Sequence, residues 1–181
     1  MTELLTLARD AGFEETAPLR AAQLMFRPEV RDMCRADRCS SYGKSWCCPP
    51  ACPSLEEMTR RMAGYGEGVL VETVGTMADD FDYEAMMAAE SLHKERFRRL
   101  TQALYGQYGR EAVLPMGAGT CRRCAKCTYP DAPCRFPEEQ VVSMEAYGLL
   151  VSQVCRDCGA AYYHGSRTIT YVSCVFLRRG L

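Results

Sequence analysis

The sequence of 181 residues lacks the features that mark membrane, exported and nucleic-acid-binding proteins. No apolar run approaches the roughly 18 residues that span a bilayer. Charged residues from Glu3 to Glu15 interrupt the N-terminus before a signal-peptide core can form. No long basic stretch is present, and the formal net charge is -1, which offers no phosphate-binding face. We therefore expect a cytoplasmic protein that binds neither membranes nor nucleic acid.

The signatures of several enzyme classes are also missing. The chain has no G-x-G-x-x-G after a strand, no P-loop and no C-x3-C-x2-C arrangement of the radical-SAM type. No Ser-His-Asp pattern can be placed. The sequence therefore names no catalytic residue and leaves open whether the protein is an enzyme.

Cysteine is abundant, with 12 in the chain. Disulfide scaffolds of that density are usually shorter and carry a signal peptide, so these thiols are expected to stay reduced. Reduced thiols in tight groups repel one another as thiolates unless a metal neutralises them. Metal ligation is therefore favoured over disulfides.

The most specific cysteine group lies in the segment 117–139. Cys121, Cys124 and Cys127 repeat at every third residue, and Cys134 follows a short turn that contains two prolines. A C-x2-C-x2-C loop can direct three sulfurs at three corners of a cubane, and a fourth cysteine completes the set. We predict a [4Fe-4S] cluster on these four residues. The position of the fourth cysteine departs from the ferredoxin run, so no ferredoxin domain is assigned.

Zinc is the alternative at this group, because it also accepts four thiolates. Zinc sites, however, usually pair two C-x2-C knuckles that are well separated in sequence.

Four cationic residues surround the second cysteine group. They would stabilise the reduced form of a negatively charged cluster, or would form a solvated basic face with no effect. These cations are Arg122, Arg123, Lys126 and Arg135.

The first cysteine group occupies the loop 34–52, which is rich in proline and glycine. A four-ligand site there can use Cys34, Cys39, Cys48 and Cys52 and leave Cys47 spare, or use Cys47 and leave Cys48 spare. Adjacent cysteines point in different directions along an extended chain, so both rarely bind one cubane. The spacing fits either a second [4Fe-4S] cluster or zinc.

The remaining cysteines and histidines do not form a recognisable site. Cys155 and Cys158 fall at the C-terminal end of an expected helix, where the helix dipole does not activate a thiol as in redox C-x2-C pairs. Cys174 is expected to be a small buried residue, and His93 a buried histidine of the core. His164 lies among tyrosines and can line a pocket.

Patterns of apolar residues predict an α+β fold in one unit, 1–181: a small β-sheet with packed helices and two cysteine-rich metal-binding loops at one end of the sheet. The longest expected helix has apolar residues at steps of three and four, and another begins with a capping box at Ser54 and Glu57. The last strand is apolar on both faces and should lie inside the sheet. Expected helices are 2–11, 18–25, 55–63, 79–108 and 143–154; expected strands are 68–75, 111–116 and 169–177; and 28–54 is expected to be loop.

The cysteine loops resemble a family of predicted metal-binding proteins, domain of unknown function 2284, over about residues 25–177. That family shares a Cys-Pro-Pro motif, here Cys48-Pro49-Pro50, and the resemblance favours Cys48 over Cys47 as the N-terminal ligand. It implies metal binding and no reaction. The other stretches that carry it are Cys34…Cys39…Tyr42-Gly43-Lys44…Trp46, Gly119 before the C-x2-C-x2-C run, Cys134-Arg135-Phe136-Pro137, Ser143-Met144-Glu145-Ala146 and Tyr163…Gly165…Thr168-Ile169-Thr170-Tyr171…Cys174.

These observations predict an iron–sulfur protein that transfers electrons to a redox partner protein in anaerobic metabolism. Two thiolate-rich groups without a substrate motif are the basis of that expectation. A zinc-stabilised interaction module without a redox role is one alternative. An enzyme whose cluster binds substrate at an open position, close to the spare Cys47, is another.

Overall fold

A four-stranded antiparallel sheet forms the centre of the protein. The computed structural model describes residues 1–180, and the strands are β1 (Glu15–Arg20), β2 (Tyr65–Thr76), β3 (Val113–Met116) and β4 (Thr168–Arg178). Their order in the sheet is β1-β2-β4-β3. β4 therefore pairs on both sides, as its two apolar faces predict. The α+β class expected from the sequence is confirmed.

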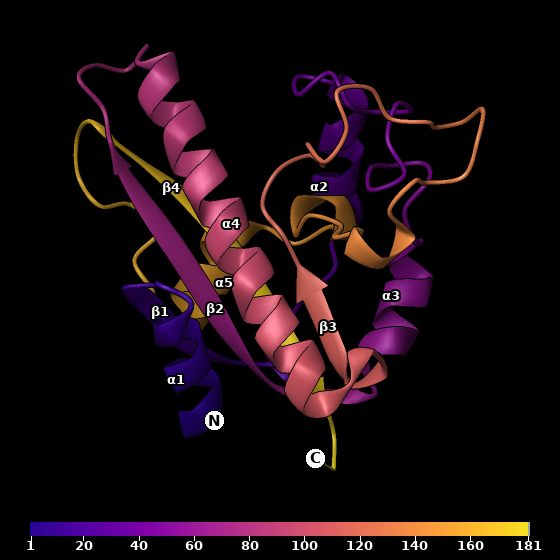
Figure 1. The fold of residues 1–181 in the computed structure, drawn as a ribbon, viewed down its shortest axis with the longest axis vertical. Coiled ribbons are helices and arrows are strands. Elements are labelled where there is room, and N and C mark those ends of the chain that lie inside the picture. Colours follow the sequence, from indigo (N-terminus) through magenta and orange to yellow (C-terminus); the bar gives the residue numbers. More distant parts are fainter. Residues whose placement is uncertain (181) are drawn as a thin grey trace.

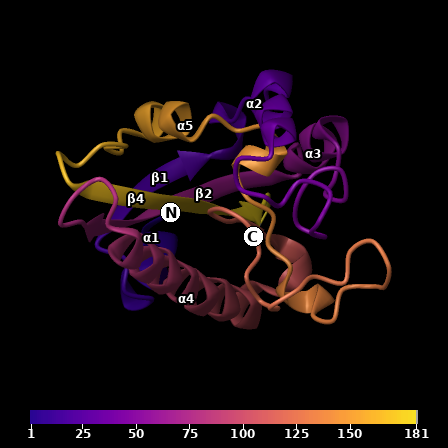
Figure 2. The ribbon, with the colours of Figure 1, turned by 90° about the horizontal axis from the view of Figure 1, so that it is seen from above.

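Helices cover both faces of this sheet (Figures 1 and 2). On one face lie α1 (Thr2–Asp10) and α4 (Tyr83–Tyr108), and on the other lie α2 (Pro28–Met33), α3 (Leu55–Met62) and α5 (Val151–Cys158). None of the helices among residues 1–180 combines the length and apolar character that a membrane crossing requires.

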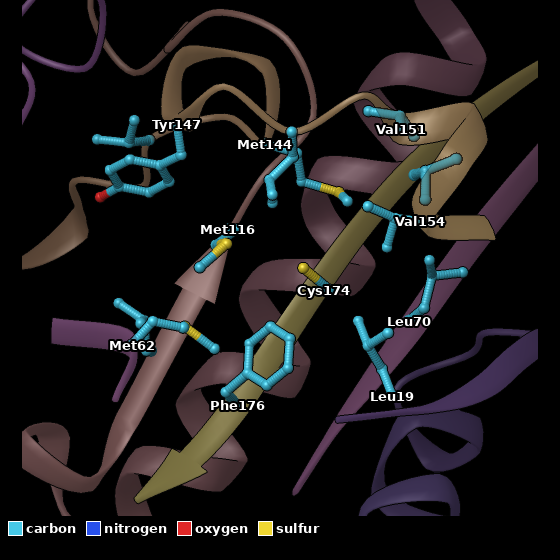
Figure 3. Packing of buried hydrophobic residues seen from close by; sticks show 14 of the residues in the cluster. Leu19, Met62, Leu70, Met116, Met144, Tyr147, Val151, Val154, Cys174 and Phe176 are labelled. Atoms are coloured by element: carbon cyan, nitrogen blue, oxygen red, sulfur yellow. The ribbon is translucent and has the colours of Figure 1, made fainter. Parts of the chain in front are cut away.

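Two hydrophobic clusters hold these layers together. In the first, Leu100 and Leu104 of α4 and Leu4 of α1 pack against Val69 and Val71 of β2. The second lies on the opposite face, where residues of all four strands meet α3, α5 and the segment before α5 (Figure 3). Its labelled members are Leu19, Met62, Leu70, Met116, Met144, Tyr147, Val151, Val154, Cys174 and Phe176. Alternation along the strands sends neighbouring residues to opposite clusters.

Several predicted elements are confirmed with small changes at their ends. The capping box of α3 forms as expected, because Ser54 Oγ accepts from the Glu57 amide at 3.1 Å and Glu57 Oε2 accepts from the Ser54 amide at 2.6 Å. The α4 helix begins after Asp82, whose carboxylate accepts from the Ala85 amide at 3.0 Å.

Three predictions from the sequence are wrong in part. Residues 18–25 do not form the predicted helix, because Pro18 lies in the edge strand β1 opposite Val69, where a missing N–H is tolerated, and only Ala21–Gln23 form a short 3-10 turn. The predicted loop 28–54 contains the short helix α2. The predicted helix 143–154 is divided into a turn, Glu145–Tyr147, and α5, because Gly148 adopts a φ of 78°.

The long loop that follows β3 carries the second cysteine group. It is closed at its base by a parallel bridge between Gly117 and Ser143, with Gly117 N donating to Val142 O and Met144 N to Gly117 O, both at 2.9 Å. The loop therefore begins and ends at the same end of β3, beside the segment that follows α2 (Figure 1).

Candidate metal centre

The two cysteine-rich segments, distant in sequence, meet in the fold. The Trp46 indole N–H donates to the Ala132 carbonyl at 3.1 Å, and its ring lies edge-on to Tyr129 with centroids 4.9 Å apart. The Cys48 sulfur lies 3.6 Å from the Thr120 hydroxyl. The turn that holds the first group therefore packs directly on the loop of the second.

A cavity of about 430 Å³ lies between these segments. All four cysteines predicted for the cluster line it, and two cysteines of the first segment, Cys39 and Cys47, line it as well. The six sulfur-bearing residues around this cavity are Cys39, Cys47, Cys121, Cys124, Cys127 and Cys134. The sequence predicted the four second-group residues for one site, whereas it placed Cys39 in the N-terminal site and kept Cys47 there as the alternative to Cys48.

The Cys47 thiol is buried and lines the same cavity as Cys121. Hydrogen bonding from the Cys47 thiol, together with the positive charges of Lys94 and Arg123, lowers the pKa of Cys121, and the same interaction raises the pKa of Cys47. Cys121 is thereby favoured as a thiolate, the form that binds metal.

Cys127 is also held in an environment that favours the thiolate. Burial opposes ionisation there, yet hydrogen bonds from the amides of Tyr129 and Trp46 and from the Ser45 hydroxyl lower the pKa of Cys127. Two of these three donors belong to the first cysteine segment. The first segment thus contributes to the electrostatics of the second group.

The four predicted ligands of the first group lie within electrostatic reach of one another. Burial, and then the charges of Cys39 and Cys48, raise the pKa of Cys34. Cys52 lies one turn after Cys48, with its amide donating to the Cys48 carbonyl at 3.2 Å. Burial raises the pKa of the Cys48 and Cys52 thiols. Grouped thiols of this kind ionise when a bound cation offsets their mutual repulsion.

A cation approaches the first group from α2. Arg31 places Nη2 at 3.5 Å from the Cys52 sulfur and also donates to the Cys52 carbonyl at 3.3 Å. Its positive charge opposes the effect of burial on the pKa of Cys52. The short helix that the sequence missed therefore positions a thiolate-stabilising residue.

Among residues 1–180, no three Cys, His, Asp or Glu side chains converge on a point that would hold a single metal ion. A tetrahedral zinc site requires sulfur atoms about 2.3 Å from the ion. The donor chemistry fits a thiophilic metal, since six cysteines surround one cavity.

The chain matches the family model described as predicted metal-binding protein (DUF2284) over residues 17–177. The chain belongs to this family. The match includes both cysteine loops and confirms the resemblance that the Cys-Pro-Pro motif indicates. No curated protein and no solved structure matches the chain. Membership of this family identifies the chain as a predicted metal-binding protein, but it specifies neither the metal nor a reaction.

Glu90 of α4, which sequence reasoning did not single out, anchors the loop of the second group. Its buried carboxylate lies 2.6 Å from Lys94 Nζ and 3.0 Å from Arg122 Nε, and Lys94 also donates to the Thr120 carbonyl. These contacts fix the backbone next to Cys121. In the sequence, this anchor is indicated by a glutamate and a lysine four residues apart in the predicted helix. Their contacts with the loop cannot be predicted from the sequence.

Two other cations near the second group, Arg123 and Arg135, also have protein partners. Arg123 pairs with Glu139 at 2.7 Å and stacks on the Phe136 ring at 4.2 Å, and Arg135 donates to the Lys126 carbonyl at 3.0 Å. Whether these exposed cations stabilise a cluster or only form a solvated basic face stays a prediction. They brace the loop and keep positive charge beside the cavity.

The third cysteine group is separate from the cavity. Cys155 is buried on α5 and donates to Glu72 Oε1 at 3.6 Å, while Glu72 Oε2 lies 2.9 Å from His164 Nε2. Burial and the charge of Glu72 raise the pKa of Cys155 to about 12, which keeps this thiol protonated. The C-x2-C pair ends α5 before Gly159, as the sequence predicts, and the buried Glu72 was missed because it lies in an otherwise apolar strand segment.

Proposed function

We propose that this protein is an iron–sulfur protein that transfers electrons to a partner protein. The single observation that carries the proposal is the cavity lined by six cysteines from two segments, with cations braced around it. A [4Fe-4S] cluster requires thiolates spread around a space of its own size, whereas one zinc ion requires them at a single point. Cys121, Cys124, Cys127 and Cys134 are the proposed ligands from the second group.

A second metal centre is proposed on Cys34, Cys39, Cys48 and Cys52. Its support is their mutual proximity and the approach of Arg31 to Cys52. When bound, iron–sulfur centres accept and release single electrons. The residues of the chain supply thiolates, hydrogen bonds to sulfur and positive charge, which together set the potential.

The test is metal analysis of protein produced and purified without oxygen. Iron and acid-labile sulfide in equal amounts, with visible absorbance that bleaches on chemical reduction, are the expected results. Zinc without sulfide in the same preparation would contradict the iron–sulfur proposal and favour a zinc-stabilised interaction module.

A second candidate function is an enzyme that binds its substrate beside the centre. A cavity of about 380 Å³ lies between α4 and the loop 117–123, with Phe97, Thr101 and Val141 in its wall, and Cys121 also borders it. Pockets of this size and mixed polarity are typical of small-molecule sites. A change in the electron paramagnetic resonance (EPR) spectrum of the reduced protein on addition of a small molecule would favour this candidate over a simple electron carrier.

A further inference from the structure

The cavity of about 380 Å³ between α4 and the loop 117–123 (the α4 cavity) shares a wall with the cavity that the six cysteines line. Residues 120–123 line both cavities, and Cys121 borders each of them. A molecule in the α4 cavity would therefore lie beside a proposed cluster ligand, and it need not replace any of the four proposed ligands.

Apolar side chains form a continuous part of the wall of the α4 cavity. Phe97 and Tyr105 come from α4 and Val141 from the end of the cysteine loop, and all three pack in the same hydrophobic cluster. The buried polar groups of the wall already have partners, since His93 Nε2 lies 2.7 Å from the Ser173 hydroxyl. This part of the cavity therefore fits an apolar molecular body.

The charged side chains around the α4 cavity comprise five cations and four carboxylates. Arg110 Nε lies 3.2 Å from Glu138 Oε2, and these two residues form a one-to-one pair. Arg123 Nε and Glu139 Oε2, 2.7 Å apart, form another. The remaining charges are Glu95 and Arg98, one of each sign and both exposed on α4, and the group Glu90, Lys94 and Arg122 beside Cys121.

In this last group, one carboxylate serves two cations. Glu90 Oε1 lies 2.6 Å from Lys94 Nζ and 3.0 Å from Arg122 Nε. Within residues 1–180, the Arg122 guanidinium makes this one hydrogen bond, so its other N–H groups can donate to a ligand. The surplus positive charge of the α4 cavity thus lies at the wall shared with the cysteines. A single surplus charge matches a carboxylate better than a doubly charged phosphate.

We propose that the α4 cavity binds a small organic carboxylate, with its charged end against Arg122 and Lys94 and its apolar body against Phe97 and Val141. The inference deepens the second candidate function by naming its ligand class, and it rests on the cavity of that function. The bound anion would lie next to a negatively charged cluster, so binding and reduction oppose each other. By thermodynamic linkage, the anion binds the oxidised protein more tightly and makes the centre harder to reduce.

Three probes of one shape test the preference for an anion. Benzoate, benzamide and benzamidine carry a negative charge, no charge and a positive charge. In isothermal titration calorimetry of protein purified without oxygen, benzoate should bind about tenfold more tightly than benzamide, because hydrogen bonds to charged groups are the stronger ones. Benzamidine should bind most weakly. Equal affinities for benzoate and benzamide, or no binding of any probe, would overturn the proposal.

Arg122→Gln tests the charged end of the site and leaves the pair of Glu90 with Lys94 in place. Its affinity for benzoate should fall to about that for benzamide, while Arg122→Lys should retain most of the preference. Arg99→Gln is the matched control, because Arg99 is an exposed arginine of α4 that does not line the cavity. Equal losses of benzoate affinity in Arg99→Gln and Arg122→Gln would indicate a general charge effect and contradict the site.

Val141→Phe tests the apolar end, because the larger side chain occupies space in the cavity. It should weaken benzoate and benzamide alike, and full affinity in this variant would place the probes elsewhere. Far-UV circular dichroism checks the fold. Arg122→Gln, which changes a half-exposed side chain, covers the case in which Val141→Phe does not fold.

A redox titration tests the link to the metal centre. Saturating benzoate should lower the midpoint potential of the iron–sulfur protein, and benzamide should leave it unchanged. An unchanged potential with benzoate bound would place the carboxylate away from Cys121 and contradict the proposal. The outcomes for the two functions are separable: zinc in place of iron and sulfide would reject electron transfer, whereas the calorimetry decides the carboxylate site with either metal.

Discussion

His93 shows how a single buried residue connects the sheet to α4. Its Nδ1 lies 3.0 Å from the Thr73 hydroxyl and its Nε2 lies 2.7 Å from the Ser173 hydroxyl, so both ring nitrogens have partners on β2 and β4. The expectation of a core histidine is confirmed. Burial, and then the charges of Lys94 and Arg96, lower the pKa of His93 to about 3, so the ring is neutral in the folded protein.

This neutral histidine predicts a pH dependence of stability. The unfolded chain binds a proton at His93 below its ordinary pKa of about 6.5, while the folded chain does not until about pH 3. Stability is therefore complete above pH 6.5 and falls as the pH drops, by about 2 kcal/mol between pH 7 and pH 5. We expect His93→Gln to lack this part of the decline in urea unfolding measured at both pH values. Equal declines in the two proteins would contradict the assignment.

Cys124 gives the most direct test of the second-group ligands. It lines the cavity but belongs to neither hydrophobic cluster, so its replacement should leave the core intact. Cys124→Ser is expected to reduce bound iron by about half, with the N-terminal centre retained. Iron content equal to that of the unsubstituted protein would remove Cys124 from the ligand set.

At the scale of elements, sequence patterns were reliable where one local rule decided the outcome. The capping box placed the start of α3, and the apolar period identified α4. The sequence patterns failed where a tertiary contact decided the secondary structure. Pro18 looked like the start of a helix, but pairing with β2 holds this residue in strand β1. Residues 143–154 looked like one helix, although the chain turns at Gly148 to approach α2.

Gly148 provides a prediction about that turn. A Cβ at this position would lie 2.8 Å from the Arg27 carbonyl oxygen and 2.9 Å from Leu55, and the residue has a φ of 78°. The Arg27 amide also donates to the Gly148 carbonyl at 2.8 Å, so the backbone cannot move away without losing that bond. We expect Gly148→Ala to lower the free energy of unfolding by about 2–4 kcal/mol, combining backbone strain with the steric clash.

Gly159 is the matched control for this effect. Its φ is 77°, nearly the same, but no atom lies within 4 Å of a Cβ built there. Gly159→Ala should therefore cost only the backbone strain, about 1 kcal/mol. Chemical denaturation of both variants measures the difference, and equal losses would show that the Arg27 contact is unimportant.

For the molecule as a whole, the sequence predicted which cysteines form groups and that both loops lie at one end of the sheet, but not that the two groups share a cavity. The contact of Trp46 with Ala132 and that of Glu90 with Arg122 join segments distant in the chain, and no periodicity or spacing reports such contacts. For the same reason, the sequence did not indicate that Cys47 lines the cavity of the second cysteine group. Local spacing identifies ligand loops, whereas the fold decides which loops share a cavity.

The division between a packed core and cysteine loops predicts the behaviour of metal-free protein. The helices and strands bury two apolar clusters, whereas the loops 34–52 and 117–144 contribute few large apolar side chains beyond their bases. Metal bonding is expected to supply the free energy that orders the loops. Metal-free protein should keep most of its far-UV helix signal while trypsin cleaves at Lys44 and Lys126. Equal resistance of these sites with and without metal would show that the loops are ordered independently.

The hydrogen-bonded base formed by Gly117 and Ser143 has a consequence for variation and design. The loop leaves and rejoins the fold at one place, so its length is not transmitted to the pairing of β3 with β4. Closing a longer loop costs little additional entropy, because the cost grows with the logarithm of length. Insertions or deletions between these two anchor points are therefore expected to leave the sheet in register, so that new ligand spacings can be introduced there.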